Sequence, residues 1–178
     1  HILIQVVGSL REAHSVGLIH RDIKPSNILL CERGGIPEFV KVIDFGLVKQ
    51  AHADDGAMLT QANTIAGTPL FMAPESVTNA DEVTSAVDIY ALGCVAYFLL
   101  TGAPPFTGNS VIEICAHHLH TPPTPISQRS AMPINAVLEA LILRCLAKHP
   151  GERPDDASLF MALEELRETL PYRLGKSQ

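Results

Sequence analysis

The spacing of apolar residues along the chain predicts a mostly helical protein. A first helix, ended by Gly17, is expected from apolar residues that recur every three or four positions: Leu3, Val6, Leu10 and Ala13. A second helix would begin after a cap at Thr84 or Ser85 and end at Thr101. Because nearly all of its residues are apolar, this second helix is expected to be buried on almost every side.

Three more helices are expected in the second half of the chain. One would start at Asn109 or Ser110 and reach about Leu119. The other two are indicated by apolar residues at helical spacing, which are Val137, Leu138, Leu141, Ile142 and Cys145 in one helix and Leu159, Leu163, Leu166 and Leu170 in the other. Asp155 or Asp156 would cap the last of these helices.

Two short β-prone runs, 28–31 and 40–43, predict a hairpin with a long connection through residues 32–39. The segment 46–74 has no hydrophobic period, and a stretch of that length in a compact chain is usually a functional loop or disorder. The expected fold class is therefore α+β. One mostly helical domain with a small hairpin would occupy residues 1–171, followed by a short tail over 172–178.

Composition narrows the classes of function. The net charge is −6 and no run of Lys or Arg occurs, so we expect no nucleic-acid partner. The four cysteines have no paired spacing, which indicates reduced thiols and a cytoplasmic location. The most apolar run, 89–100, is shorter than the roughly 20 residues of a membrane span. The chain opens on His1 and is expected to be a fragment, so a membrane tether could lie outside it.

The polar segment 20–27, His-Arg-Asp-Ile-Lys-Pro-Ser-Asn, carries the strongest chemical signal. Phosphoryl transfer requires an acceptor hydroxyl held in line, metal ions on the phosphates and positive charge near the migrating group. Asp22 could accept or orient the hydroxyl proton, and Lys24 could reach the γ-phosphate. Asn27 could offer an oxygen atom to Mg²⁺. On its own, a polar loop of this kind would be read as solvated; the whole eight-residue string favours catalysis.

A second carboxylate, Asp44, follows the second expected strand and begins an Asp-Phe-Gly triplet. A strand end is a rigid place from which to aim a carboxylate at a metal ion, and Gly46 lets the chain turn away. A lone triplet could equally be a plain exit from a hairpin. This one lies 22 residues after Asp22, in the order of the protein-kinase signature, which favours a metal ligand.

These motifs resemble those of the eukaryotic-type serine/threonine protein kinases, most of all their bacterial branch. The likeness covers essentially the whole chain, because the segments 67–75, 88–93, 100–106 and 149–154 also match in order. It implies the mostly helical, C-terminal large lobe of the kinase fold. It also implies transfer of phosphate from ATP, with Mg²⁺, to Ser or Thr of protein substrates. The glycine-rich loop and strand lysine of the family's small lobe do not occur in the 178 residues.

The resemblance implies roles for individual residues. Asp22 would be the catalytic carboxylate, and Lys24 would contact ATP and indicate specificity for Ser and Thr. Asn27 and Asp44 would be the Mg²⁺ ligands that also bind ATP. Thr68 would belong to the substrate platform and hydrogen-bond the catalytic Asp and Lys.

Other residues would support the site. The resemblance implies a buried salt bridge between Glu75 and Arg153, and it implies that Asp88 anchors the catalytic-loop backbone near His20 and Arg21. An Arg beside the catalytic Asp is typical of kinases that are switched by phosphorylation of the activation loop, because it can bind the phosphate.

The phosphorylated residue is expected to be Thr64, with Thr60 as second choice, since both lie in the aperiodic segment before Glu75. The three histidines at 117, 118 and 120 are interpreted as a solvated helix face rather than a zinc site, which usually needs three or four ligands in defined geometry.

Two other classes of function remain open. One is a pseudokinase or scaffolding module on the same fold, against which the intact Asp22, Lys24, Asn27 and Asp44 argue. The other is a small-molecule phosphotransferase of related fold, which is disfavoured by the resemblance of 67–75 to a peptide-substrate platform.

Overall fold

The computed structural model describes residues 1–34, 36–45, 69–79 and 83–169. Its helices are α1 (Ile2–Ser15), α2 (Pro74–Thr78), α3 (Ala86–Thr101), α4 (Val111–His120), α5 (Ala136–Cys145) and α6 (Asp156–Thr169), and its strands are β1 (Ile28–Arg33) and β2 (Ile36–Val42). Short 3-10 turns occur at Pro25–Asn27, Pro69–Phe71, Ile126–Gln128 and Pro150–Glu152. This arrangement confirms the expected fold class. The boundary expected at residue 171 lies outside the described residues.

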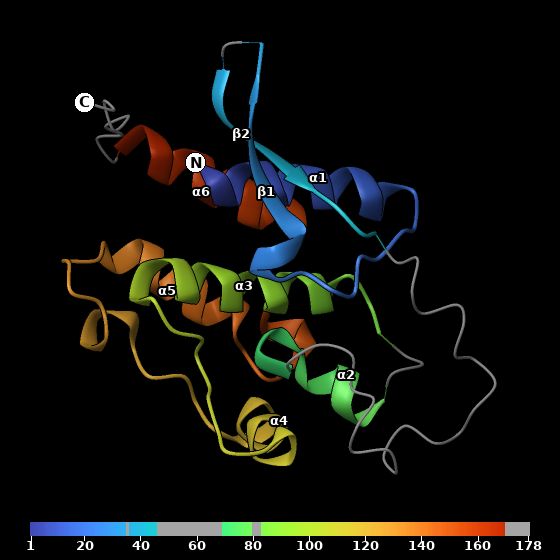
Figure 1. Cartoon of the computed structure of the whole chain (residues 1–178), viewed down its shortest axis with the longest axis vertical. Coiled ribbons are helices and arrows are strands. Elements are labelled where there is room, and N and C mark those ends of the chain that lie inside the picture. The colour runs from blue at the N-terminus through green and yellow to red at the C-terminus, as the bar shows by residue number, and fades with distance from the viewer. Residues whose placement is uncertain (35, 46–68, 80–82, 170–178) are drawn as a thin grey trace.

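Helix α3 lies in the middle of the molecule, with α1, α6 and the hairpin on one side and α2 and α4 on the other (Figure 1). Its residues from Val87 to Tyr97 are all buried, as its apolar composition predicted. Residues of α3 belong to two hydrophobic clusters. In one cluster α3 packs against α1, β2 and α6, and in the other it packs against α5 and the segment before α2. Gly102, in the left-handed conformation at φ 75°, ends the helix.

Helices α4 and α6 begin at capping residues that the sequence predicted, and α5 begins at a cap, Asn135, that was not predicted. Side-chain oxygens of Ser110, Asn135 and Asp155 accept backbone N–H groups in the first turns of α4, α5 and α6. Helix α3 differs, because Ser85 precedes it without a side-chain cap and Thr84 accepts only the N–H of Ala86, at 3.4 Å.

The long hairpin connection expected over 32–39 is wrong. Strand β1 continues to Arg33 and β2 starts at Ile36, so only residues 34 and 35 lie between them. Gly34, at φ 59°, makes the turn. The extended pairing is irregular between residues 31 and 33, and it places the Arg33 guanidinium 5.1 Å from the centre of the Phe39 ring.

Candidate active site

His20 fixes the polar loop after α1 to the end of strand β2. Its imidazole is buried, with Nδ1 accepting the N–H of Asp22 at 3.2 Å and Nε2 donating to the carbonyl of Ile43 at 2.8 Å. The N–H of Ile43 in turn donates to the carbonyl of Asn27 at 3.0 Å. Ile43 is thus held at both backbone groups, and the residue after it, Asp44, is placed beside the loop.

Asp88, in the first turn of α3, binds the backbone of the same loop. Its side chain is 1% exposed, and its two oxygens accept the N–H groups of His20 and Arg21, each at 2.8 Å. Arg21 has a left-handed backbone at φ 65°, which is costly for a residue with a side chain and persists only where the surroundings impose it. The anchoring contact implied by the resemblance is therefore present.

Asp22, Lys24 and Asn27 form one hydrogen-bonded group on this loop. The Lys24 ammonium lies 2.8 Å from Oδ2 of Asp22, and Nδ2 of Asn27 donates to Oδ2 and to the backbone carbonyl of Asp22 at 3.1 and 2.8 Å. Asn27 is buried, whereas the Asp22 side chain is 52% exposed. The Asp22 carboxylate is therefore accessible to solvent, while the buried Asn27 holds it in place.

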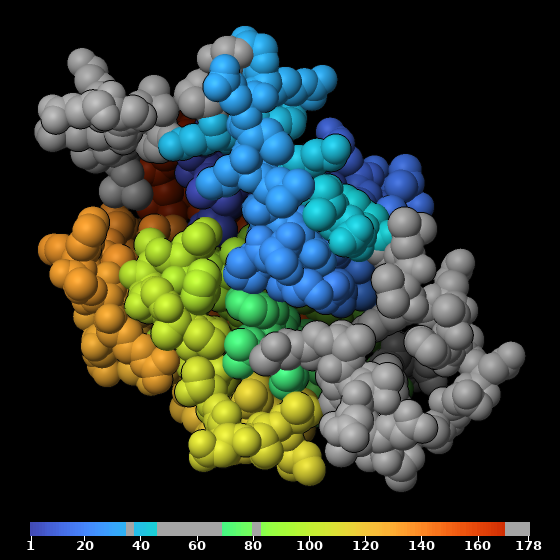
Figure 2. Space-filling view, viewed as in Figure 1, coloured from blue at the N-terminus to red at the C-terminus, as the bar shows by residue number. Residues whose placement is uncertain are grey.

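Asp44 is exposed and, like Arg21, has a left-handed backbone, with φ at 61°. No hydrogen bond or ion pair joins its carboxylate to another described residue. In Figure 2 the blue loop and the cyan end of β2 lie side by side on one surface, above the green α2. The hydrogen bonds of the Asn27 side chain are made by its Nδ2, which leaves Oδ1 available. This amide oxygen and the Asp44 carboxylate are oxygen ligands of the kind that Mg²⁺ prefers.

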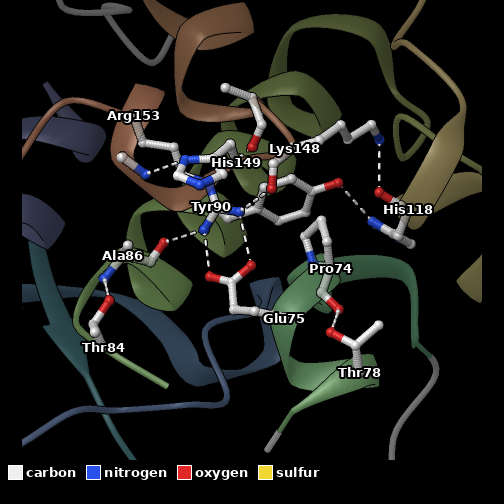
Figure 3. Close-up of polar contacts among 12 residues, drawn as sticks. Pro74, Glu75, Thr78, Thr84, Ala86, Tyr90, His118, Lys148, His149 and Arg153 are labelled. Atoms are coloured by element: carbon white, nitrogen blue, oxygen red, sulfur yellow. Dashed lines mark hydrogen bonds and ion pairs between the residues drawn. The ribbon is translucent and has the colours of Figure 1, made fainter. Parts of the chain in front are cut away.

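Arg153 forms the second cluster of charges, at the junction of α2 and α3 (Figure 3). Its guanidinium forms a bidentate ion pair with the Glu75 carboxylate, with N···O distances of 2.6 and 2.8 Å. The salt bridge implied by the resemblance is therefore present. Its other three donor hydrogens go to the carbonyls of Ala86, Ala147 and Lys148, at 2.9, 2.9 and 3.0 Å. The Arg153 side chain is 0% exposed, and all five of its donors are used. It ties α2, which follows the segment 46–74, to the start of α3.

Beside this ion pair, the expected solvated face of α4 is wrong at one position. His118 is fully buried, with Nδ1 2.9 Å from the hydroxyl of Tyr90 (Figure 3). It shares the inner face of α4 with Ile114, one turn earlier, while His120 is exposed. Burial, followed by the nearby Lys148 ammonium, lowers the pKa of His118 to about 4. His118 is therefore a neutral core residue.

Lys148 caps the C-terminal end of α4. Its ammonium donates to the carbonyls of His117 and His118, at 3.2 and 2.7 Å, and lies 4.3 Å from the centre of the Phe106 ring. Burial lowers the pKa of Lys148 to about 8.

No role in the site was predicted for His14 or for Asp156, which was expected only as an alternative helix cap, although the two side chains are hydrogen-bonded to each other. His14 also reaches Asp88. A signal existed for His14, because it follows the buried Val7 and Leu10 at helical spacing and so belongs to the inner face of α1. For Asp156 no local signal exists, since it lies 142 residues from its partner.

Three of the residues singled out from the sequence, Thr60, Thr64 and Thr68, lie outside the described residues. Within the described ranges, no helix has the length and apolar character to cross a membrane. The same ranges contain no group of three or more His, Cys, Asp or Glu side chains arranged to hold a metal ion.

Comparison with known proteins decides the family. The pattern of the protein kinase domain matches residues 1–164. The chain belongs to the protein kinase family. Members of this family generally use ATP and Mg²⁺.

Curated relatives of the chain are bacterial. It is 42% identical over 163 residues to serine/threonine-protein kinase pkn3 of Myxococcus xanthus, which covers 90% of this chain and 30% of the relative. It is 46% identical over 153 residues to Pkn1 of the same organism, covering 85% and 21%. PknB of Mycobacterium tuberculosis is 38% identical over 157 residues, covering 88% and 24%. The chain thus spans less than a third of the length of these relatives, and the bacterial-type resemblance is confirmed.

Proposed function

We propose that this chain is the large lobe of a serine/threonine protein kinase and supplies the groups that move the γ-phosphate of ATP to Ser or Thr hydroxyls of proteins. The observation that carries the proposal is the geometry of one loop. Asp22 presents a solvent-exposed carboxylate while Lys24 and Asn27 hold it, and the same loop is bonded to the residue before Asp44. The relatives are all named serine/threonine-protein kinases, which supports the same acceptor class.

Asp22 and Lys24 act on opposite partners in the transfer. The exposed Asp22 carboxylate orients the acceptor hydroxyl and receives its proton. The Lys24 ammonium, 2.8 Å from that carboxylate, sits where it can stabilise negative charge on the migrating phosphoryl group. The buried Asn27 holds Asp22 in place, because its Nδ2 donates to the backbone carbonyl and to the carboxylate of Asp22.

Asn27 and Asp44 would hold Mg²⁺. Their free oxygens fit a hard cation, and a bound Mg²⁺ would neutralise charge on the phosphates. The backbone around Ile43 fixes the distance between the two residues, since it is bonded to Asn27 on one side and His20 on the other.

The protein substrate would lie along the segment that leads into α2. In this proposal Thr68 belongs to the substrate platform, and phosphorylation of Thr64, or of Thr60, would bring a phosphate to Arg21. The support is the Glu75–Arg153 ion pair, which gives this segment a rigid C-terminal end. With a net charge of −6, no nucleic-acid partner is proposed.

The test joins this chain to the ATP-binding small lobe of a protein kinase and measures transfer of labelled γ-phosphate to peptides with Ser, Thr or Tyr acceptors. We expect Mg²⁺-dependent transfer to Ser or Thr at roughly 1–100 per second, and none to Tyr. The chain alone and the small lobe alone should both be nearly inactive. A folded fusion that binds ATP but transfers phosphate neither to a peptide, nor to itself, nor to water would indicate a pseudokinase instead.

A further inference from the structure

Three charged side chains, one from each of three helices, are hydrogen-bonded in a row that ends at the polar loop 20–27. His14, in the last turn of α1, has its Nε2 2.9 Å from Oδ2 of Asp88 on α3 and its Nδ1 3.0 Å from Oδ2 of Asp156 on α6. The side chains of His14 and Asp88 are 7% and 1% exposed, and that of Asp156 is 25% exposed. The proposed chemistry uses neither His14 nor Asp156, so the reason for burying this cluster lies elsewhere.

The two contacts define the charge of the imidazole. Ionised carboxylates only accept hydrogen bonds, so His14 must carry a proton on both ring nitrogens to donate to both. Burial lowers the pKa of His14, but the hydrogen bonds to Asp88 and Asp156 outweigh it and raise the pKa above its usual value. These two carboxylates are the charged groups that act on His14 from the helices packed against it.

Each charge also lies at the helix end that favours it. Asp88 is in the first turn of α3, Asp156 is the first residue of α6, and His14 is in the last turn of α1. Helix dipoles stabilise negative charge at N-termini and positive charge at C-termini. The three helix ends therefore support one carboxylate–imidazolium–carboxylate bridge.

We propose that His14 and Asp156 are positioning residues that hold the Asp88 carboxylate, and through it the backbone of His20 and Arg21, in place for catalysis at Asp22. Oδ2 of Asp88 accepts both from His14 and from the N–H of His20. A shift of this oxygen would move the loop backbone at His20, which lies two residues before Asp22. The catalytic consequence rests on the proposed function; the structural bridge does not.

The first test measures the bridge without any catalytic readout. Histidine NMR titration of the full chain, joined to the small lobe as above, should give His14 a pKa above the usual 6.5. Asp156→Asn should lower that pKa. Asp155→Asn is the matched control, because Asp155 is the neighbouring carboxylate that caps α6 and Asn caps a helix equally well. If His14 titrates alike in both variants, or at its ordinary pKa in the unaltered protein, the proposal is overturned.

The second test asks whether the bridge positions the loop. At pH 8, the amides of His20 and Arg21 should exchange with deuterium faster in Asp156→Asn than in Asp155→Asn. In the same comparison kcat should fall roughly 3- to 30-fold, with the KM for ATP unchanged, and the alkaline limb of the kcat profile should move by the shift that NMR measures. Asp156→Glu should restore part of the loss. Unchanged amide exchange overturns the positioning role even in a protein without kinase activity, so the two proposals fail separately.

Discussion

The polar loop 20–27 and the cluster around Arg153 are both built on charged side chains, but they leave those side chains in opposite states. Asp22 is half-exposed and keeps an oxygen available to solvent. Arg153 is wholly buried and uses all five of its donor hydrogens. A group that must meet a substrate cannot be saturated by its own protein, whereas an unsatisfied buried group destabilises the fold. Substitutions in the loop should therefore reduce activity, whereas substitutions around Arg153 should reduce stability.

Two histidines whose side chains are largely covered, His14 and His118, offer a second comparison, because both contact α3. His14 lies between two carboxylates and is held charged, while His118 lies against the Tyr90 hydroxyl and near the Lys148 ammonium and is held neutral. Burial acts in the same direction on both. The neighbours decide which state is stable.

The largest losses of activity are expected at the two exposed carboxylates, Asp22 and Asp44, and Asp44→Asn tests the metal-ligand role. Loss of a metal-binding carboxylate should slow phosphate transfer by the small-lobe fusion roughly 10³-fold. The melting temperature should hardly change, since the side chain is exposed and pairs with no other described residue. Glu32→Gln, which removes an exposed carboxylate on β1, is the control and should leave the rate unchanged. A wild-type rate with Mg²⁺ in Asp44→Asn would contradict the metal-ligand role.

Arg153→Ala should act on stability instead. It leaves the Glu75 carboxylate and three backbone carbonyls without their donor, at a cost of about 3–5 kcal/mol. For a chain of this size that corresponds to a fall of about 6–20 °C in melting temperature. Arg144→Ala, which removes an exposed side chain bonded only at 3.4 Å to the Glu152 carbonyl, should shift melting little. Equal melting of the two variants would count against the ion pair as a support.

Acid should weaken the fold through His118. Its pKa is about 4 in the folded chain against an ordinary 6.5, so the unfolded chain binds the extra proton between these values. The stability that neutral His118 contributes, at most about 3 kcal/mol, is fully present above pH 6.5 and is lost as the pH falls towards 4. Urea unfolding of wild type and His118→Asn at pH 7 and pH 4.5 measures it. We expect the difference between the two proteins to shrink in acid; a constant difference would refute the neutral state.

His14 should show the opposite dependence, because its folded pKa is raised. Its contribution is fully present below the ordinary pKa and is lost as the pH rises through the raised one.

The smallest effect is expected at the proposed phosphorylation sites. A phosphate at Thr64 or Thr60 adds about −1.5 to −2 charge and would bind Arg21. Changing both threonines to Ala should reduce the activity of the phosphorylated protein about fivefold and leave its melting temperature unchanged. Mass spectrometry before and after phosphatase treatment locates the phosphate. Full activity in the double variant would show that Arg21 is purely structural.

The sequence predicted those features whose residues are adjacent or belong to a shared motif. Segment 20–27 is contiguous, and the resemblance paired Glu75 with Arg153 and placed Asp88 under His20 and Arg21.

Features that depend on contacts between distant helices were missed. Asp156 gains its partner only when α6 packs on α1, and His118 is buried because α4 turns that face inward, against Tyr90. The hairpin was predicted too short because Gly34 and its polar neighbours read as a loop, although cross-strand pairing continues to Arg33.

The most direct measurement compares phosphate transfer and melting temperature in the same preparations of Asp22→Asn and Arg153→Ala, each in the small-lobe fusion. Asp22→Asn is expected to melt like the wild type and to transfer phosphate about 10²–10⁴-fold more slowly. Arg153→Ala, assayed well below its lowered melting temperature, should retain far more activity. A folded Asp22→Asn protein that transfers phosphate at the wild-type rate would contradict the assignment of catalysis to this loop.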